Sequence, residues 1–137
     1  TPAGVFSADR FAGRLDFLSI GTNDLTQYVM AADRENNAVA DLHDPLYPAV
    51  LRAIDYAVTA ADKHDAWVGM CGEMAGNPEL TELLIGLGLD ELSMSAVSVP
   101  AVKKQVINTD THSAKELAAD VLNCQSREDV YETLDLS

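Results

Sequence analysis

Positive charge is scarce in this sequence. Only nine of its 137 residues are Lys or Arg, against 22 that are Asp or Glu, and the formal net charge is −13. Nucleic acids and anionic membrane surfaces are bound through basic patches, so the composition argues against both kinds of partner. Two explanations of the acidity remain open: an ordinary acidic surface, or adaptation to high salt, where ions screen the repulsion among carboxylates.

Cysteines and long apolar runs are also rare. Cys71 and Cys124 lie far apart and form no C-x-x-C pair, which argues against a zinc site and a disulfide scaffold. No stretch approaches the roughly twenty apolar residues of a membrane span, and the N-terminal residues lack the pattern of a signal peptide. We therefore expect a cytoplasmic protein with reduced thiols. Because the sequence begins with Thr1 rather than Met, we also expect it to be part of a longer chain.

Short apolar runs alternate with helical patterns along the chain. The runs at 16–20, 66–70 and 91–95 have the length and composition of buried strands. Helices are expected at 48–64, 77–86, 100–106, 113–122 and from 126 onward. Asn77, Ser113 and Ser126 are the expected N-caps, with Glu116 completing a capping box for Ser113 and Asp129 following Ser126 by three positions. This alternation predicts one α/β domain with a parallel sheet over residues 1–137.

Small and polar residues follow each predicted strand. The sequence reads GTND at 21–24, CGE at 71–73 and SMS at 93–95. In α/β folds the chemistry lies at the carboxyl ends of parallel strands, so these residues are expected to converge. Asp24 is an oxygen ligand suited to Mg²⁺, and the Asn23 amide can donate to a carboxylate or a phosphate. Arg34 offers a planar fork for the same anions, and the Cys71 thiol can donate or accept a proton.

Each of these residues also has a purely structural interpretation. Asn23 and Asp24 could cap a helix that begins near Leu25, and Arg34 could be one surface charge among many. Cys71 could be a small core residue. The histidines have no partner spacing and are expected to be solvated; they are His43, His64 and His112. The segment 32–48 lacks periodicity and is expected to be a loop at a functional edge.

Longer strings carry a resemblance to a known family. Residues 20–28 read IGTNDLTQY, 32–36 read ADREN, 70–76 read MCGEMAG and 88–95 read GLDELSMS. These strings resemble, in order and at suitable spacing, the motifs of Enzyme I of the phosphoenolpyruvate:sugar phosphotransferase system. The resemblance extends from Thr1 to about Ala119. Pyruvate phosphate dikinase and phosphoenolpyruvate synthase share the GTND-type and CGE-type strings and are the second candidates.

The resemblance implies a fold and an activity. It implies that residues 1–137 form roughly the last three βα units of a (β/α)₈ barrel that binds phosphoenolpyruvate and Mg²⁺ and forms homodimers. Asp24 would then bind Mg²⁺, Asn23 and Arg34 would contact the phosphate, and Cys71 would protonate the enolate of pyruvate. The phosphoryl group would pass to a histidine on a separate N-terminal domain and then to the phosphocarrier protein HPr.

The resemblance also indicates what this sequence lacks. In the family, a Glu directly precedes the Thr-Pro-Ala string and is a second Mg²⁺ carboxylate, whereas here Thr1 opens the sequence. Arginines on earlier strands and the phosphorylated histidine domain are likewise outside it. We therefore expect this chain alone to have no turnover, at most feeble Mg²⁺ affinity and a tendency to self-associate. A non-catalytic, self-associating module is the remaining alternative.

Overall fold

A parallel three-stranded sheet forms the centre of the computed structural model, which describes residues 1–136. The strands lie in the order β1 (Phe17–Gly21), β2 (Trp67–Cys71) and β3 (Glu91–Ser93), so all three predicted strands are confirmed with small shifts of their ends. The α-helices are α1 (Pro2–Ala12), α2 (Thr22–Met30), α3 (Pro48–Asp62), α4 (Thr81–Gly86), α5 (Val99–Asn108), α6 (Thr111–Asn123) and α7 (Arg127–Thr133). Short 3₁₀ helices are η1 (Asn37–Leu42), η2 (Met74–Gly76) and η3 (Pro78–Leu80). The predicted α/β class is confirmed.

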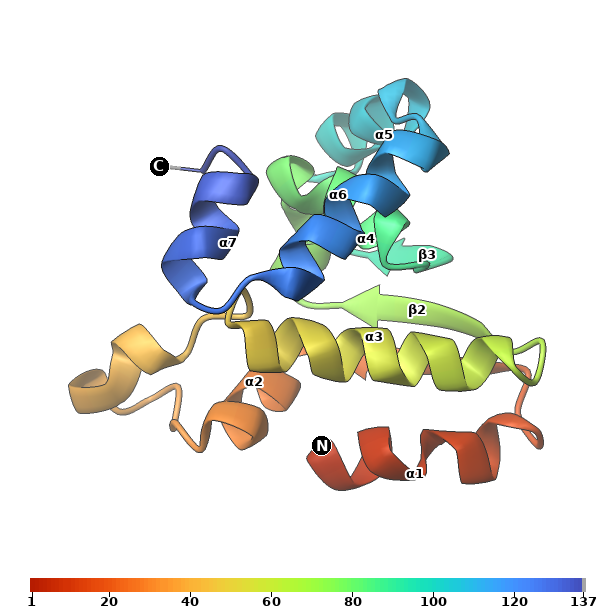
Figure 1. The fold of residues 1–137 in the computed structure, drawn as a ribbon, viewed down its shortest axis with the longest axis horizontal. Coiled ribbons are helices and arrows are strands. Elements are labelled where there is room, and N and C mark those ends of the chain that lie inside the picture. The colour runs from red at the N-terminus through yellow and green to blue at the C-terminus, as the bar shows by residue number, and fades with distance from the viewer. Residues whose placement is uncertain (137) are drawn as a thin grey trace.

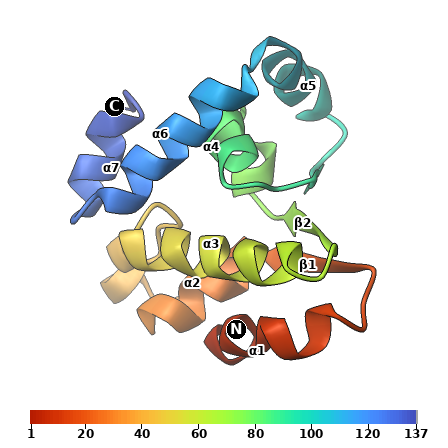
Figure 2. The same ribbon diagram turned by 45° about the vertical axis from the view of Figure 1, so that its right-hand side comes forward.

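The helices form two groups, as Figure 1 shows. In the first group, α3 packs on β1 and β2 and also contacts α1 and α2. In the second group, α6 packs against α4 and α7, and α5 lies beside α4. The two groups meet where α6 contacts α3 (Figure 2). No helix within residues 1–136 is both long enough and apolar enough to span a membrane.

The long helix α3 provides much of the core. Pro48 stands in its first turn, where the missing N–H of proline costs nothing. Its buried residues recur at helical spacing, and Val50, Leu51 and Ile54 are fully enclosed. In the second group, α4 and α6 cross closely. Any side chain at Gly86 would collide with the Ala114 backbone. Glycine therefore lets α4 and α6 approach closely.

Two helix starts differ from the sequence prediction. The helix α1 was not predicted; its N-cap Thr1 accepts a hydrogen bond from the Gly4 N–H at 3.1 Å. The predicted capping box at Ser113 is wrong, because α6 begins three residues earlier with Asp110 as its N-cap. The Asp110 carboxylate accepts from the backbone N–H groups of His112 and Ser113, at 3.0 and 2.9 Å. A carboxylate caps a helix at least as well as a hydroxyl, so the earlier residue sets the start.

The other two predicted N-caps are confirmed. Asn77 accepts from the Glu79 N–H at 2.9 Å and begins η3, from which α4 continues. Ser126 and Asp129 form a reciprocal capping box at the start of α7. This box fixes the first turn of the last helix.

The two faces of the sheet are covered differently. Ile20, Val68 and Met70 point toward the helices and are at most 8% exposed. On the opposite face, Phe17 and Trp67 are 49% and 38% exposed, and their rings stack with centroids 4.4 Å apart. We call this second surface the open face of the sheet. It carries side chains from alternate positions of each strand, as the pleat requires.

Candidate functional site

The carboxyl ends of the three strands meet at one edge of the sheet. Gly21 pairs with Cys71 and Cys71 pairs with Ser93, so the residues that follow each strand emerge side by side. The segments after the strands line a shared open hollow of about 570 Å³; its lining residues are Asn23, Gly72, Glu73, Gly76, Ser93, Met94, Ser95 and Ser98. The predicted convergence of the polar strand ends is confirmed for the residues after all three strands.

Asn23 and Asp24 lie in the first turn of α2. The helix begins at Thr22, directly after β1, and its N-cap is Gly21, which offers no side chain. The interpretation of Asn23 and Asp24 as caps is therefore wrong. Asn23 is half-buried and lines the hollow, whereas the Asp24 side chain is 71% exposed. The start of a helix carries partial positive charge, which favours an anion beside this turn.

Arg34 lies next to Asp24, although it comes from the segment after α2. Its Nη1 is 3.8 Å from the Asp24 Oδ1, and the side chains are 49% and 71% exposed. An exposed pair at this distance contributes about 1 kcal/mol or less, so both side chains can turn to a ligand. The backbone of Arg34 is tethered more locally, since its N–H donates to the Gln27 Oε1 at 3.4 Å.

Cys71 is exposed at the end of β2. The interpretation of this thiol as a buried core residue is therefore wrong. Thr22 is buried, and its hydroxyl donates to the Cys71 carbonyl oxygen at 3.2 Å, which ties the end of β2 to the start of α2. The next residue, Gly72, has φ +109°, and a Cβ there would lie 2.6 Å from the Thr22 Oγ1. Glycine is thus required for β2 to turn away after the thiol.

Sequence reasoning missed two residues that border this site. His43 was expected to be solvated, but it is half-buried and its Nε2 lies 3.0 Å from the Asn23 carbonyl oxygen. It lines a second hollow beside the first; the other lining residues are Asn23, Arg34, Glu35, Pro45, Glu73 and Met74. Glu73 borders both hollows and stands in the CGE string. No spacing marked His43, because only the fold of the segment 32–47 brings it to Asn23.

The other two histidines lie away from this edge. His64 is 3.4 Å from the Asp9 carboxylate, near the opposite end of α3. His112 is 83% exposed and is 3.6 Å from the Glu116 carboxylate, so it is solvated as expected. His43 is therefore the histidine that borders the hollows.

The residues present fit a divalent cation only in part. Within residues 1–136 no group of three or more His, Cys, Asp or Glu side chains could enclose a metal ion. Mg²⁺ is often held by one or two carboxylates, with substrate oxygens and water completing the shell. The exposed carboxylate of Asp24 suits one such position, and its loose contact with Arg34 leaves its oxygens available.

The fold is that of a parallel α/β protein in which polar residues gather at the carboxyl edge of the sheet. A family model described as "PEP-utilising enzyme, PEP-binding domain" matches residues 1–111. The chain therefore belongs to the family of PEP-utilising enzymes.

Individual relatives agree with the family assignment. A phosphoenolpyruvate-protein phosphotransferase from Haloferax volcanii is 62% identical over 136 residues, which cover 99% of this chain and 24% of that protein. A protein of the same name from Buchnera aphidicola (subspecies Schizaphis graminum) is 42% identical over 134 residues, covering 98% and 24%. A multiphosphoryl transfer protein from Escherichia coli O6:H1 is 44% identical over 129 residues, covering 94% and 16%. The chain thus spans about a quarter or less of the length of these relatives.

Proposed function

We propose that this chain supplies part of the phosphoenolpyruvate site of a phosphoenolpyruvate-protein phosphotransferase, Enzyme I. The full protein would transfer the phosphoryl group of phosphoenolpyruvate to one of its own histidines and then to HPr, and would release pyruvate. The observation that carries the proposal is the common edge at which β1 and β2 end, where Cys71 closes β2, Asn23 and Asp24 follow β1, and Arg34 lies beside Asp24. The names of the two phosphotransferase relatives support the same activity.

The proposed architecture is the last part of a (β/α)₈ barrel, formed by residues 1–137. The parallel strands support it, because a (β/α)₈ barrel is built of parallel strands and the open face leaves one side of this sheet free of helices. Phe17 pairs with Trp67 at the amino ends of the strands, and Gly21, Cys71 and Ser93 pair in turn at the carboxyl ends. In the barrel, the open face would become interior and the free edges of β1 and β3 would pair with further strands.

The residues at the edge have distinct proposed roles. Asn23 and Arg34 bind and orient the phosphate through N–H donors, which suits a reaction that depends on positioning and charge neutralisation. Asp24 would hold Mg²⁺, which when bound supplies positive charge against the phosphoryl oxygens. The second Mg²⁺ carboxylate is proposed to be the Glu that precedes the Thr-Pro-Ala string in the family.

Cys71 is the proposed proton donor. Breaking the P–O bond of phosphoenolpyruvate leaves the enolate of pyruvate, while a P–N bond forms on the accepting histidine. A new C–H bond then forms at the enolate carbon as the S–H bond of Cys71 breaks, and the thiolate recovers its proton from water. A thiol can donate and recover a proton near neutral pH.

The direct test uses the full-length gene product that contains this sequence. Pyruvate release from phosphoenolpyruvate should require Mg²⁺ and HPr, and Cys71→Ala should lower it by about 100-fold or more. The matched control is Cys124→Ala, since Cys124 follows α6 and lines neither hollow. Release that needs ATP or AMP and ignores HPr would instead indicate a dikinase or a synthase.

The absence of turnover in the full-length protein at low and at high salt would favour the non-catalytic, self-associating module. Alkylation separates the two possibilities further, because a site thiol at position 71 should react and be protected by phosphoenolpyruvate. The isolated chain should show no turnover and self-associate, which sedimentation can measure. Tight phosphoenolpyruvate binding by this chain alone would contradict the proposal that the site is incomplete.

A further inference from the structure

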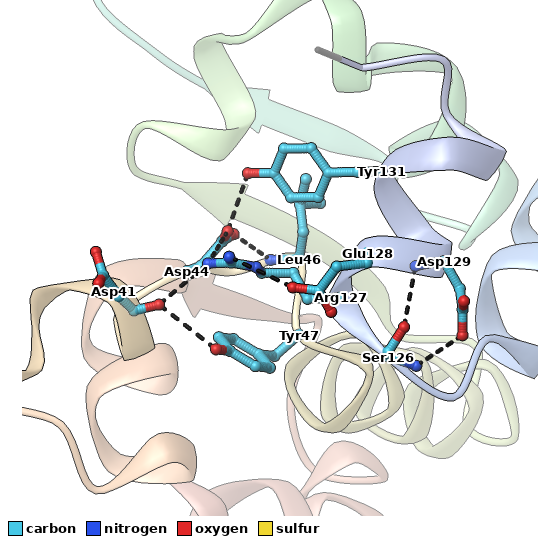
Figure 3. Close-up of polar contacts among 9 residues, drawn as sticks. All are labelled: Asp41, Asp44, Leu46, Tyr47, Ser126, Arg127, Glu128, Asp129 and Tyr131. Carbon is cyan, nitrogen blue, oxygen red and sulfur yellow. Dashed lines mark hydrogen bonds and ion pairs between the residues drawn. The ribbon is translucent and has the colours of Figure 1, made fainter.

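The last helix contacts the segment that borders the site. Helix α7 lies beyond residues 1–111, which match the PEP-binding domain, yet it packs beside the segment 41–47. Figure 1 shows α2, this segment and α7 gathered on the same side of the molecule, and Figure 3 shows the contacts. None of these contacts involves the residues to which the proposed chemistry was assigned.

Asp44 is the centre of these contacts. Its Oδ2 accepts a hydrogen bond from the Tyr131 hydroxyl at 2.9 Å and lies 3.6 Å from the Arg127 Nη1. Its Oδ1 accepts from the Leu46 N–H at 2.8 Å. The Asp44 side chain is only 16% exposed, so these partners replace much of its water. Burial, together with the neighbouring Asp44 carboxylate, raises the pKa of the Tyr131 hydroxyl and keeps it a proton donor.

Arg127 joins α7 to the same segment at a second point. Its Nη1 also donates to the Asp41 carbonyl oxygen at 3.1 Å. The guanidinium carbon lies 5.4 Å from the Tyr47 ring centroid and 5.9 Å from that of Tyr131, within the range of cation–π attraction. The capping box at Ser126 fixes the turn that carries Arg127. Arg127 and Tyr131 therefore hold the segment 41–47 through residues that come before and after His43.

His43 connects the segment held by α7 to the candidate site. It directly precedes Asp44, and its Nε2 is 3.0 Å from the carbonyl oxygen of Asn23 in the first turn of α2. A continuous chain of contacts thus leads from α7 through Asp44 and His43 to the turn that carries Asn23 and Asp24. Residues 35–42 join Arg34 to His43, and both of these residues line the second hollow.

We propose that Arg127 and Tyr131 are positioning residues, which hold Asp44 and thereby keep His43 against Asn23 in the ligand-ready arrangement. The proposal rests on the proposed function of the Asn23 edge. If only a fraction of the molecules holds the segment in place, the apparent affinity for ligand falls by that fraction, whereas the rate at saturation is unchanged. Loss of the contacts between α7 and the segment 41–47 should therefore raise KM rather than lower kcat.

The kinetic test uses the full-length gene product. Arg127→Met should raise the KM for phosphoenolpyruvate by about 10-fold and Tyr131→Phe by about 3-fold, with kcat within about twofold of wild type. Arg127→Lys should recover only part of the loss, because it keeps the charge but not the planar fork. The control Glu132→Gln changes an exposed residue of the same helix and should leave both constants unchanged. General destabilisation would instead lower apparent kcat at constant KM, and that result would overturn the proposal.

Two further readouts do not depend on turnover. Hydrogen exchange of the Leu46 and Tyr47 amides should speed up in Arg127→Met and Tyr131→Phe relative to amides in the middle of α3. The imidazole nitrogen shifts of His43, assigned with His43→Gln, should move toward those of a free ring. If the exchange rates and the His43 shifts both change but the wild type shows no turnover, the positioning of the segment by α7 is supported and the enzyme assignment is refuted. Unchanged exchange, or faster exchange with an unchanged KM in an active enzyme, would refute the positioning role.

Discussion

The two faces of the sheet differ in how completely the described residues cover them. On the helix side, Ile20, Val68 and Met70 are at most 8% exposed, beneath a packed layer. On the open face, Phe17 and Trp67 keep 49% and 38% of their surface exposed. Because apolar surface gains stability by leaving water, the helix side of the sheet forms a closed core, whereas the apolar rings of the open face remain in contact with water.

The comparison is tested most strongly by truncating one large side chain on each side. Leu51→Ala, in the enclosed core of α3, should lower the free energy of unfolding by about 2–5 kcal/mol. Phe17→Ala, on the open face, should cost about 1 kcal/mol or less in this chain, because half of its surface is already hydrated. Urea unfolding measures both. If Phe17→Ala costs far more in the full-length protein, the open face is covered there; equal costs of the two variants in this chain would refute the comparison.

A second test compares two glycines at the site edge. Gly72→Ala should cost about 1–3 kcal/mol, since it places a side chain at φ +109° and 2.6 Å from the Thr22 Oγ1. Gly21→Ala is the matched control: its Cβ would lie 4.0 Å from the Cys71 Sγ, an ordinary contact distance. Denaturant unfolding should separate the two variants. Equal stability would mean that the turn after Cys71 is not strained by a side chain.

Salt tests whether the exposed acidic surface limits stability. With a net charge of −13, the unfolding temperature should rise by about 4 °C or more between dilute buffer and molar KCl, as screening removes self-repulsion. A control with four exposed acids neutralised, Asp62→Asn, Glu82→Gln, Asp120→Asn and Glu132→Gln, should respond less. A fold equally stable in dilute buffer would contradict adaptation to high salt and leave the ordinary acidic surface.

The smallest expected effect concerns acid and the helix caps. The backbone N–H of Ser113 is the main cause that holds the pKa of Asp110 below its usual value. A lowered folded-state pKa gives stability that is present above the unfolded-state pKa and is lost as the pH falls through the folded-state pKa. Asp110→Asn, which can still cap, should therefore flatten the loss of thermal stability below about pH 4. Burial raises the pKa of Asp55, so protonation of Asp55 stabilises the folded state as the pH falls. Asp55→Asn removes this contribution and should therefore steepen the loss of thermal stability in acid.

Local chemistry explains which elements the sequence revealed. The strands were predictable because each is a short apolar run ended by small residues, and Ser126 with Asp129 formed the expected cap. The start of α6 was misjudged because Asp110 and Ser113 both resemble caps, and only the backbone path selects the first. His43 was missed because its contact with the Asn23 carbonyl oxygen, 20 residues earlier in sequence, is set by the path of the irregular segment 32–47. Contacts across such separations leave no periodic pattern.

Trp67 gives the open face its own optical signal. It is the single tryptophan of the sequence, and it stacks on Phe17 at the amino ends of the strands, at the opposite end of β2 from Cys71. A half-exposed indole emits at longer wavelength than a buried one, so covering the open face should shift the emission to the blue without any label. The same residue thus allows assembly on this face to be followed by intrinsic fluorescence while the thiol at the other end of the strand stays unmodified.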